Sequence, residues 1–160
     1  MKNVTKNVYN MVETERNIVR TFVKRDDFMD RNVTKEFEKW LKSTRKTALF
    51  VDGARQIGKT YSLREFGRAH YTHFAELNFL EDPAAKAIFD GNLDADTLVT
   101  NLTAYLRTPL EPGNTVVFFD EIQECPNART AIKFLVEDGR FDYMESGSLL
   151  GVNYKHVPSM

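Results

Sequence analysis

The sequence predicts an α/β fold in which helices cover both faces of a parallel β-sheet. From Thr47 onward, short apolar runs alternate with segments whose apolar residues recur at helical spacing, a pattern typical of strands joined by helical crossovers. The chain has 160 residues, of which 42% are hydrophobic and 12 are phenylalanine, enough for one sizeable core. Its 22 Lys and Arg nearly balance 23 Asp and Glu, so this composition excludes a disordered chain.

Two helical segments are expected ahead of the sheet. Residues 1–27 carry apolar residues at helical spacing, although β-branched side chains weaken this helical extension. These apolar residues are Val4, Val8, Met11, Val12, Ile18, Val19, Phe22 and Val23. In the next helix, Val33, Phe37, Trp40 and Leu41 form one apolar stripe, and either Asp30 or Asn32 can cap its start.

The sheet itself is expected to contain four strands separated by helices. The strands are Thr47–Asp52, His73–Leu80, Thr115–Phe119 and Phe141–Ser146. The helices run from Lys59 to about Ala69, over 94–107 with Asp94 or Asp96 as cap, and from Pro126 to an end at Gly139. Proline suits a first helical position, and glycine suits the position after a helix end.

The turn after the first strand contains a phosphate-binding motif. Its residues are Gly53, Ala54, Arg55, Gln56, Ile57, Gly58, Lys59 and Thr60, which match G-x-x-x-x-G-K-[ST]. Glycine lets the backbone approach phosphate closely, and successive N–H groups at a helix N-terminus bind anions. Lys59 is expected to reach the β- and γ-phosphates, and Thr60 to offer its hydroxyl to Mg²⁺. We also assign the next residue, Tyr61, to this nucleotide-binding segment.

A second candidate element of the site ends the third strand. Val116–Phe119 runs directly into Asp120 and Glu121, and ligands of open α/β sheets bind at the carboxyl ends of strands. Asp120 is expected to hold Mg²⁺, and Glu121 to orient and activate the attacking water. The alternative is that these two acids merely begin a surface loop.

Three polar residues are candidate sensors of the nucleotide. Ser146 and Ser148 end the fourth strand, where a hydroxyl can contact the γ-phosphate or the attacking water. Asn78 lies late in the second strand and is expected to bond Glu121 if the two strands are neighbours. An ordinary loop is the alternative for the serines.

Motifs that are absent narrow the class of nucleotide enzyme. The sequence has no Asn-Lys-x-Asp guanine-reading motif and no ABC signature before Asp120. A small-molecule kinase stays open, but the Asp120-Glu121 pair that ends the strand favours water as the acceptor, so ATP hydrolysis is favoured. Cys125 is the single cysteine, and the longest apolar runs have four residues, so we expect a cytoplasmic protein without an internal disulfide or a membrane span.

Charge is unevenly distributed along the chain. Residues 1–46 carry 12 Lys and Arg against 7 Asp and Glu, whereas residues 47–160 carry 10 against 16. Nucleic acid is therefore a candidate partner of the basic N-terminal part. The alternative is that these basic residues form the solvent face of a helix; they are Lys35, Lys39, Lys42, Arg45 and Lys46.

The motifs together resemble one family. Residues 49–60, Leu77–Glu81, Phe118–Gln123 and Ser146–Gly151 are similar to those of the AAA-type predicted ATPases of bacteria and archaea. In these proteins an ATPase core precedes a C-terminal domain of unassigned function. The resemblance covers about residues 28–160 and implies a P-loop fold with strand order 5-1-4-3-2. It also implies ATP and Mg²⁺ as ligands, and Ser146 or Ser148 at the sensor position.

The chain departs from this family pattern in two ways. It stops before a fifth strand and a lid, so we expect a truncated core with order 1-4-3-2 whose first strand is an unpaired edge for association between copies. Glu145 stands where relatives tend to carry a small or apolar residue, and it is expected to rotate outward or bind a proton. The resulting hypothesis is a weak Mg²⁺-dependent ATPase; the alternative is a non-catalytic nucleotide-binding or interaction module.

Overall fold

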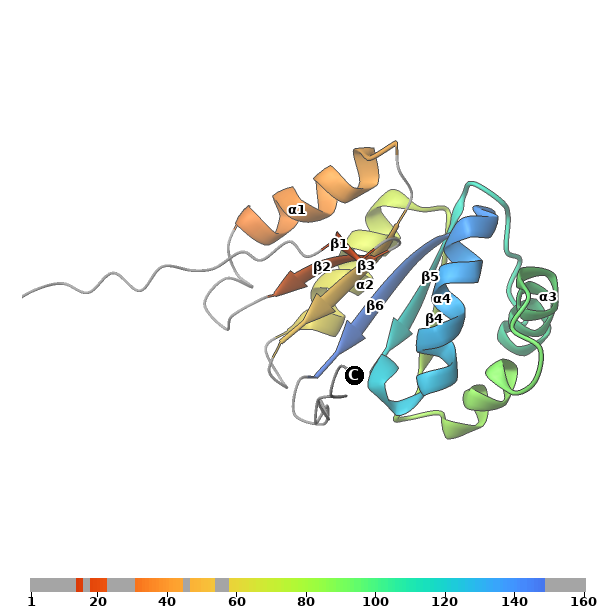
Figure 1. The fold of residues 1–160 in the computed structure, drawn as a ribbon. Coiled ribbons are helices and arrows are strands. Elements are labelled where there is room, and N and C mark those ends of the chain that lie inside the picture. The colour runs from red at the N-terminus through yellow and green to blue at the C-terminus, as the bar shows by residue number, and fades with distance from the viewer. Residues whose placement is uncertain (1–13, 16–17, 23–30, 45–46, 54–57, 149–160) are drawn as a thin grey trace, which may run out of the picture.

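The computed structural model describes residues 14–15, 18–22, 31–44, 47–53 and 58–148. The strands form one twisted sheet, and helices cover both of its faces (Figure 1). The strands are β1 (Thr14–Glu15), β2 (Ile18–Phe22), β3 (Ala48–Asp52), β4 (His73–Asn78), β5 (Thr115–Asp120) and β6 (Asp142–Gly147). The α-helices are α1 (Arg31–Lys42), α2 (Lys59–His70), α3 (Ala95–Leu106) and α4 (Pro126–Asp138).

The four predicted strands form the centre of the sheet in the predicted order. The sheet order is β1-β2-β3-β6-β5-β4, so the strands from Thr47 onward follow the order 1-4-3-2. Pairs β3–β6, β6–β5 and β5–β4 are all parallel, and their carboxyl ends therefore share one edge. This part of the expected α/β fold is confirmed.

The prediction of a helical extension is wrong for the described residues between 14 and 22. These residues form β1 and β2, and β2 pairs in parallel with β3 from Ile18↔Ala48 to Phe22↔Asp52. Since β2 occupies this side, β3 is not the unpaired edge that we expected. Ile18, Val19 and Phe22 fit a strand as well as a helix, and the open hydrogen-bonding groups of β3 decide in favour of the strand. The remainder of the predicted extension lies outside the described residues.

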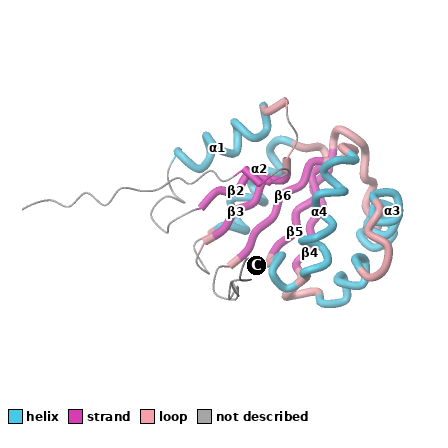
Figure 2. The backbone as a smooth tube through the Cα atoms, in the orientation of Figure 1, coloured by secondary structure: helices cyan, strands magenta, loops and turns pink. Residues whose placement is uncertain are grey.

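Helices cover the sheet in two layers, as the tube drawing shows (Figure 2). On one face, α1 and α2 pack Phe37, Trp40 and Leu63 against Leu49 and other strand residues. On the opposite face, α3, α4 and the 3₁₀ helix η1 (Pro83–Phe89) enclose a second cluster. Every residue of β3 and β5 is buried, as expected for central strands with both faces covered.

Most predicted helix ends are confirmed. Asp94 caps α3 by accepting a hydrogen bond from the Thr97 amide at 2.9 Å, and Gly139 ends α4 with φ 74°. The Trp40 indole donates to the carbonyl of Thr47 at 2.6 Å, which ties α1 to the start of β3. The 3₁₀ helix η1 has no counterpart among the predicted elements.

Candidate active site

The described part of the phosphate-binding motif lies between β3 and α2. Gly58 has φ 93°, a left-handed conformation that favours glycine. The Lys59 side chain is buried, at 6% exposure, and its Nζ donates to the carbonyl of Gly53 at 2.9 Å. The motif residues Ala54, Arg55, Gln56 and Ile57 lie outside the described residues. Tyr61 points to solvent at 69% exposure.

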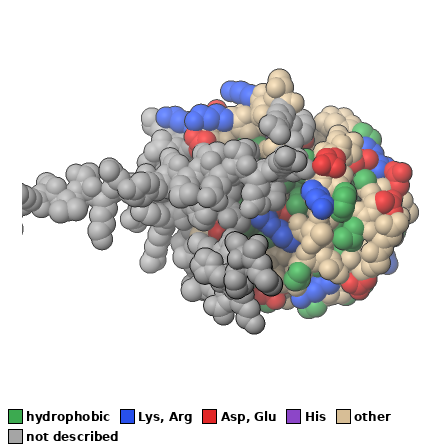
Figure 3. Space-filling model, in the orientation of Figure 1, with side chains coloured by type: hydrophobic (Ala, Val, Ile, Leu, Met, Phe, Trp, Pro, Cys, Tyr) green, Lys and Arg blue, Asp and Glu red, His purple; other side chains and the backbone are tan. Residues whose placement is uncertain are grey.

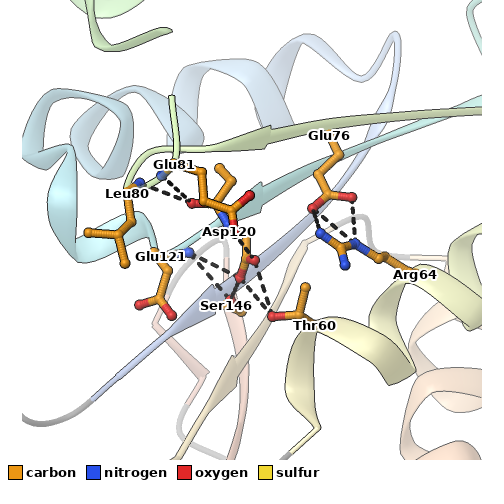
Figure 4. A network of polar contacts seen from close by, with 9 residues as sticks. Thr60, Arg64, Glu76, Leu80, Glu81, Asp120, Glu121 and Ser146 are labelled. Carbon is orange, nitrogen blue, oxygen red and sulfur yellow. Dashed lines mark hydrogen bonds and ion pairs between the residues drawn. The ribbon is translucent and has the colours of Figure 1, made fainter. Parts of the chain in front are cut away.

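Asp120 is the centre of a hydrogen-bonded cluster at the carboxyl edge of the sheet (Figure 4). The hydroxyl of Thr60 lies 3.1 Å from each of its carboxylate oxygens. Ser146 Oγ donates to Oδ1, and the Asn78 amide donates to Oδ2 at 3.1 Å. Elements α2, β4, β5 and β6 thus each contribute to one cluster, and three predicted site residues meet around Asp120.

The Asp120 carboxyl is nearly inaccessible, at 2% exposure. Burial raises its pKa, while hydrogen bonds from Ser146 and Thr60 lower it and the charge of Glu121 raises it further. A cation beside a buried carboxylate stabilises its charged form. This environment suits a Mg²⁺ ligand.

Asn78 does not bond Glu121, so that prediction is wrong. The two strands are neighbours, but Asn78 lies directly opposite Asp120 in the ladder between β4 and β5. Residues paired in this way project their side chains to the same face of the sheet, and Asn78 therefore contacts Asp120. Its Oδ1 also accepts the amides of Leu80 and Glu81, each at 3.0 Å, which fixes the orientation of its carboxamide.

Glu121 follows β5 in a left-handed conformation, with φ 53° and ψ 48°. Its amide donates to Asp120 Oδ1 at 3.1 Å and lies 3.4 Å from Ser146 Oγ. Its carboxylate oxygen Oε2 accepts from Ser148 Oγ at 3.3 Å and from Gln123 Nε2. Both predicted sensor serines therefore lie in the site, Ser146 at Asp120 and Ser148 at Glu121.

Beside this cluster lies an ion pair that the sequence did not predict. Arg64 of α2 binds Glu76 of β4 through one edge of its guanidinium, where Nε donates at 2.8 and 3.1 Å and Nη2 donates at 2.6 Å. The hydrogen bond to Glu76 raises the pKa of Arg64, and the charges of Asp120 and Glu81 raise it further. The only available signal was spacing, because Arg64 follows Thr60 by one helical turn and Glu76 precedes Asn78 by two residues.

The expectation that Glu145 rotates outward is wrong. Its side chain is fully buried and forms an ion pair with Arg129 of α4 at 2.5 Å. The Arg129 guanidinium also lies 4.4 Å from the centre of the Phe50 ring. Neighbouring residues in a strand face opposite ways, so Glu145 lies across the sheet from the Asp120 cluster.

The described basic residues of α1 lie at the surface. Lys35, Lys39 and Lys42 are exposed, and two of them pair with acids of the same helix, Glu36 at 2.6 Å and Glu38 at 3.9 Å. On the face shown in Figure 3, basic and acidic side chains of the described residues are interspersed. This arrangement favours a solvent-facing helix surface. Arg45 and Lys46 lie outside the described residues.

The described residues contain neither a metal-binding cluster nor a membrane-spanning helix. No cluster of three or more His, Cys, Asp or Glu side chains that could hold a metal ion occurs within the described ranges. None of the helices described here has the length and apolar character needed to span a bilayer.

Comparison with known proteins identifies the family. A family model described as an AAA domain matches residues 45–159, which include the phosphate-binding motif, Asp120, Glu121 and both serines. No curated protein and no solved structure gives a significant match. The matched region covers more than half of the 160 residues. The chain therefore belongs to the AAA domain family.

Proposed function

We propose that this chain is an ATPase core that binds ATP together with Mg²⁺ and, with water activated by Glu121, hydrolyses the bond between the β- and γ-phosphates to give ADP and phosphate. The main support is the cluster in which Thr60, Asp120 and Ser146 are hydrogen-bonded, with Glu121 directly beside it. A hydroxyl and a buried carboxylate at the end of a phosphate-binding loop are the groups expected to hold Mg²⁺.

The residues present fit this cation. Mg²⁺ in nucleotide sites is usually held by one or two protein oxygens, with phosphate and water completing its shell. Thr60 Oγ1 and the Asp120 carboxylate supply two such oxygens, and they already lie 3.1 Å apart. When bound, Mg²⁺ supplies positive charge that offsets the negative charge of the phosphates.

The roles of the other residues follow from their positions. Lys59 is buried, and its Nζ donates to the Gly53 carbonyl. We assign this ammonium group to the β- and γ-phosphates, which would take the place of the Gly53 carbonyl as its acceptor. Glu121 acts as the general base that accepts a proton from water. Ser146 and Ser148 are hydrogen-bonded to Asp120 and Glu121, and we assign their hydroxyls to the γ-phosphate or the attacking water.

Binding and turnover of ATP in the presence and absence of Mg²⁺ test this proposal. The wild-type chain should bind a fluorescent ATP analogue and release phosphate from ATP only with Mg²⁺. Lys59→Ala should weaken binding roughly 10- to 100-fold, because a charge-assisted hydrogen bond contributes about 1.5–3 kcal/mol. Lys35→Ala, which removes an exposed lysine of α1, is the matched control and should bind like wild type.

Two results separate the proposal from its alternative. A wild-type chain that binds ATP but releases no phosphate would be a non-catalytic nucleotide-binding module. A chain that does not bind ATP at all, or that binds equally well as Lys59→Ala, would contradict the assignment of the nucleotide site.

A further inference from the structure

We propose that Gln123 is a positioning residue that couples the end of β6 to the general base Glu121; this inference rests on the proposed ATP hydrolysis. Gln123 lies in η2 (Ile122–Glu124), a single 3₁₀ turn directly after Glu121. It touches neither Asp120 nor Thr60 in any described hydrogen bond. Its two amide atoms instead join two other parts of the site.

The carboxamide of Gln123 makes one hydrogen bond on each side. Its Nε2 donates to Glu121 Oε2 at 2.5 Å, and its Oε1 accepts from the Ser148 amide at 3.3 Å. Ser148 Oγ closes the ring by donating to the same Glu121 oxygen at 3.3 Å. A primary amide has a donor end and an acceptor end, so this side chain can make both bonds at once.

Gly147 has no side chain to occupy the space that holds the Gln123 carboxamide. A side chain at this position would begin 3.3 Å from Gln123 Oε1 and 3.1 Å from two ring atoms of Phe50. Both distances are closer than ordinary van der Waals contact, so a larger residue at position 147 requires the Phe50 ring and the Gln123 carboxamide to shift. In the sequence Ser146-Gly147-Ser148, the glycine thus leaves space for the Gln123 side chain. The serines on either side of it supply the hydroxyls that bond Asp120 and Glu121.

These contacts orient the Glu121 carboxylate. Within the described part of the chain, both of its side-chain hydrogen bonds end on Oε2, which leaves Oε1 as the oxygen that can accept a proton from water. The Glu121 backbone is anchored separately, because its N–H donates hydrogen bonds to the Asp120 carboxylate and to the Ser146 hydroxyl. A shift of the β6 end is therefore transmitted to Glu121 by two routes. One is the hydrogen bond between Ser146 and the Glu121 N–H, and the other is the Gln123 side chain.

Turnover and ATP affinity of Gln123 variants test this role. Gln123→Met keeps the length of the side chain and removes both hydrogen bonds, and it should lower kcat about 10²-fold, as a misplaced catalytic group does. The dissociation constant for ATP should stay within about twofold of wild type, since no phosphate contact is lost. Gln123→Glu keeps the shape but replaces the donor with a charge that repels Glu121, and should lower kcat at least as far. Asn127→Met, at an exposed site on α4, is the control and should leave kcat unchanged.

A double variant distinguishes positioning from a purely structural contribution. If Gln123 acts through Glu121, Gln123→Met should cause no further loss of turnover in a Glu121→Gln background. Equal kcat values for wild type, Gln123→Met and Gln123→Glu would overturn the inference while the proposed function stands. A further loss in the Glu121→Gln background would overturn it as well. A wild-type chain that binds ATP without turnover would overturn the proposed hydrolysis itself, and the inference with it. If Gln123→Met does not fold, Gln123→Glu alone decides.

Discussion

At Glu121 the chain leaves β5 in a left-handed conformation, with φ 53° and ψ 48°. This conformation costs roughly 1–2 kcal/mol for a residue with a side chain. Two hydrogen bonds from the Glu121 amide, to Asp120 and Ser146, help to hold it. Strain of this kind is concentrated at functional sites, and here it places the carboxylate beside Gln123 and Ser148.

Gly58 provides a prediction at the scale of a single residue. Its φ of 93° favours glycine, so Gly58→Ala should lower the free energy of unfolding by about 1–2 kcal/mol and should weaken ATP binding. Gly91→Ala is the matched control, because Gly91 has φ 95° and nothing near its missing side chain. It should lose similar stability, measured by urea unfolding, without losing ATP affinity. Equal loss of affinity in both variants would contradict a local role for Gly58.

Local motifs made part of this site predictable from the sequence. The residues of the phosphate-binding motif follow one another in the chain, and so do Asp120 and Glu121. Each of these two motifs depends only on its own strand and the turn after it. The partners of Asn78, Gln123 and Glu145 depend instead on strand register and on which helix covers which face. Asn78 meets Asp120 because they are opposite in the ladder, and a sequence does not state a register.

At the scale of elements, Arg140 joins the end of α4 to the start of α3. Its Nε donates to Asp138 at 2.7 Å, and its second guanidinium nitrogen donates to Asp96 at 2.7 Å. The hydrogen bond from Arg140 lowers the pKa of Asp138. An aspartate with a lowered pKa adds stability that is fully present above its ordinary pKa and is lost as pH falls through the lowered value.

Arg140→Gln should therefore be less stable than wild type by about 0.2–1 kcal/mol at pH 7. The difference should shrink below about pH 4, where aspartate begins to take up a proton in the unfolded chain. Urea unfolding at pH 7 and at several values below pH 4 measures this change. Arg107→Gln, at an exposed arginine, is the control. A difference that stays constant with pH would show that Asp138 is not the group involved.

The identity of β2 shows why elements are harder to predict than motifs. Ile18–Phe22 carries apolar residues that fit either a helix or a strand. The strand forms because β3 offers hydrogen-bonding groups along its whole length, from Ala48 to Asp52. By contrast, α4 could be predicted at both ends because Pro126 and Gly139 mark its limits locally.

At the scale of the whole molecule, β2 covers the side of β3 that β6 leaves open. Exposed edges of this kind pair with other chains. The double variant Val19→Pro/Arg20→Pro removes two adjacent backbone donors from β2 and should free β3. We expect its apparent mass in solution to rise with protein concentration relative to wild type. Val19→Thr/Arg20→Thr keeps both donors and strand-forming residues, and should behave like wild type; identical masses for the proline variant would contradict this role of β2.

The same sheet brings the site together, because β3, β6, β5 and β4 run parallel and end at one edge. The most direct test of the account is a single-turnover measurement of phosphate release from ATP with Mg²⁺ by wild type and Glu121→Gln. We predict that Glu121→Gln binds ATP as wild type does but releases phosphate about 10²- to 10⁴-fold more slowly, the range expected for loss of a general base. Equal rates in the two proteins would contradict the assignment of Glu121 as the activating base.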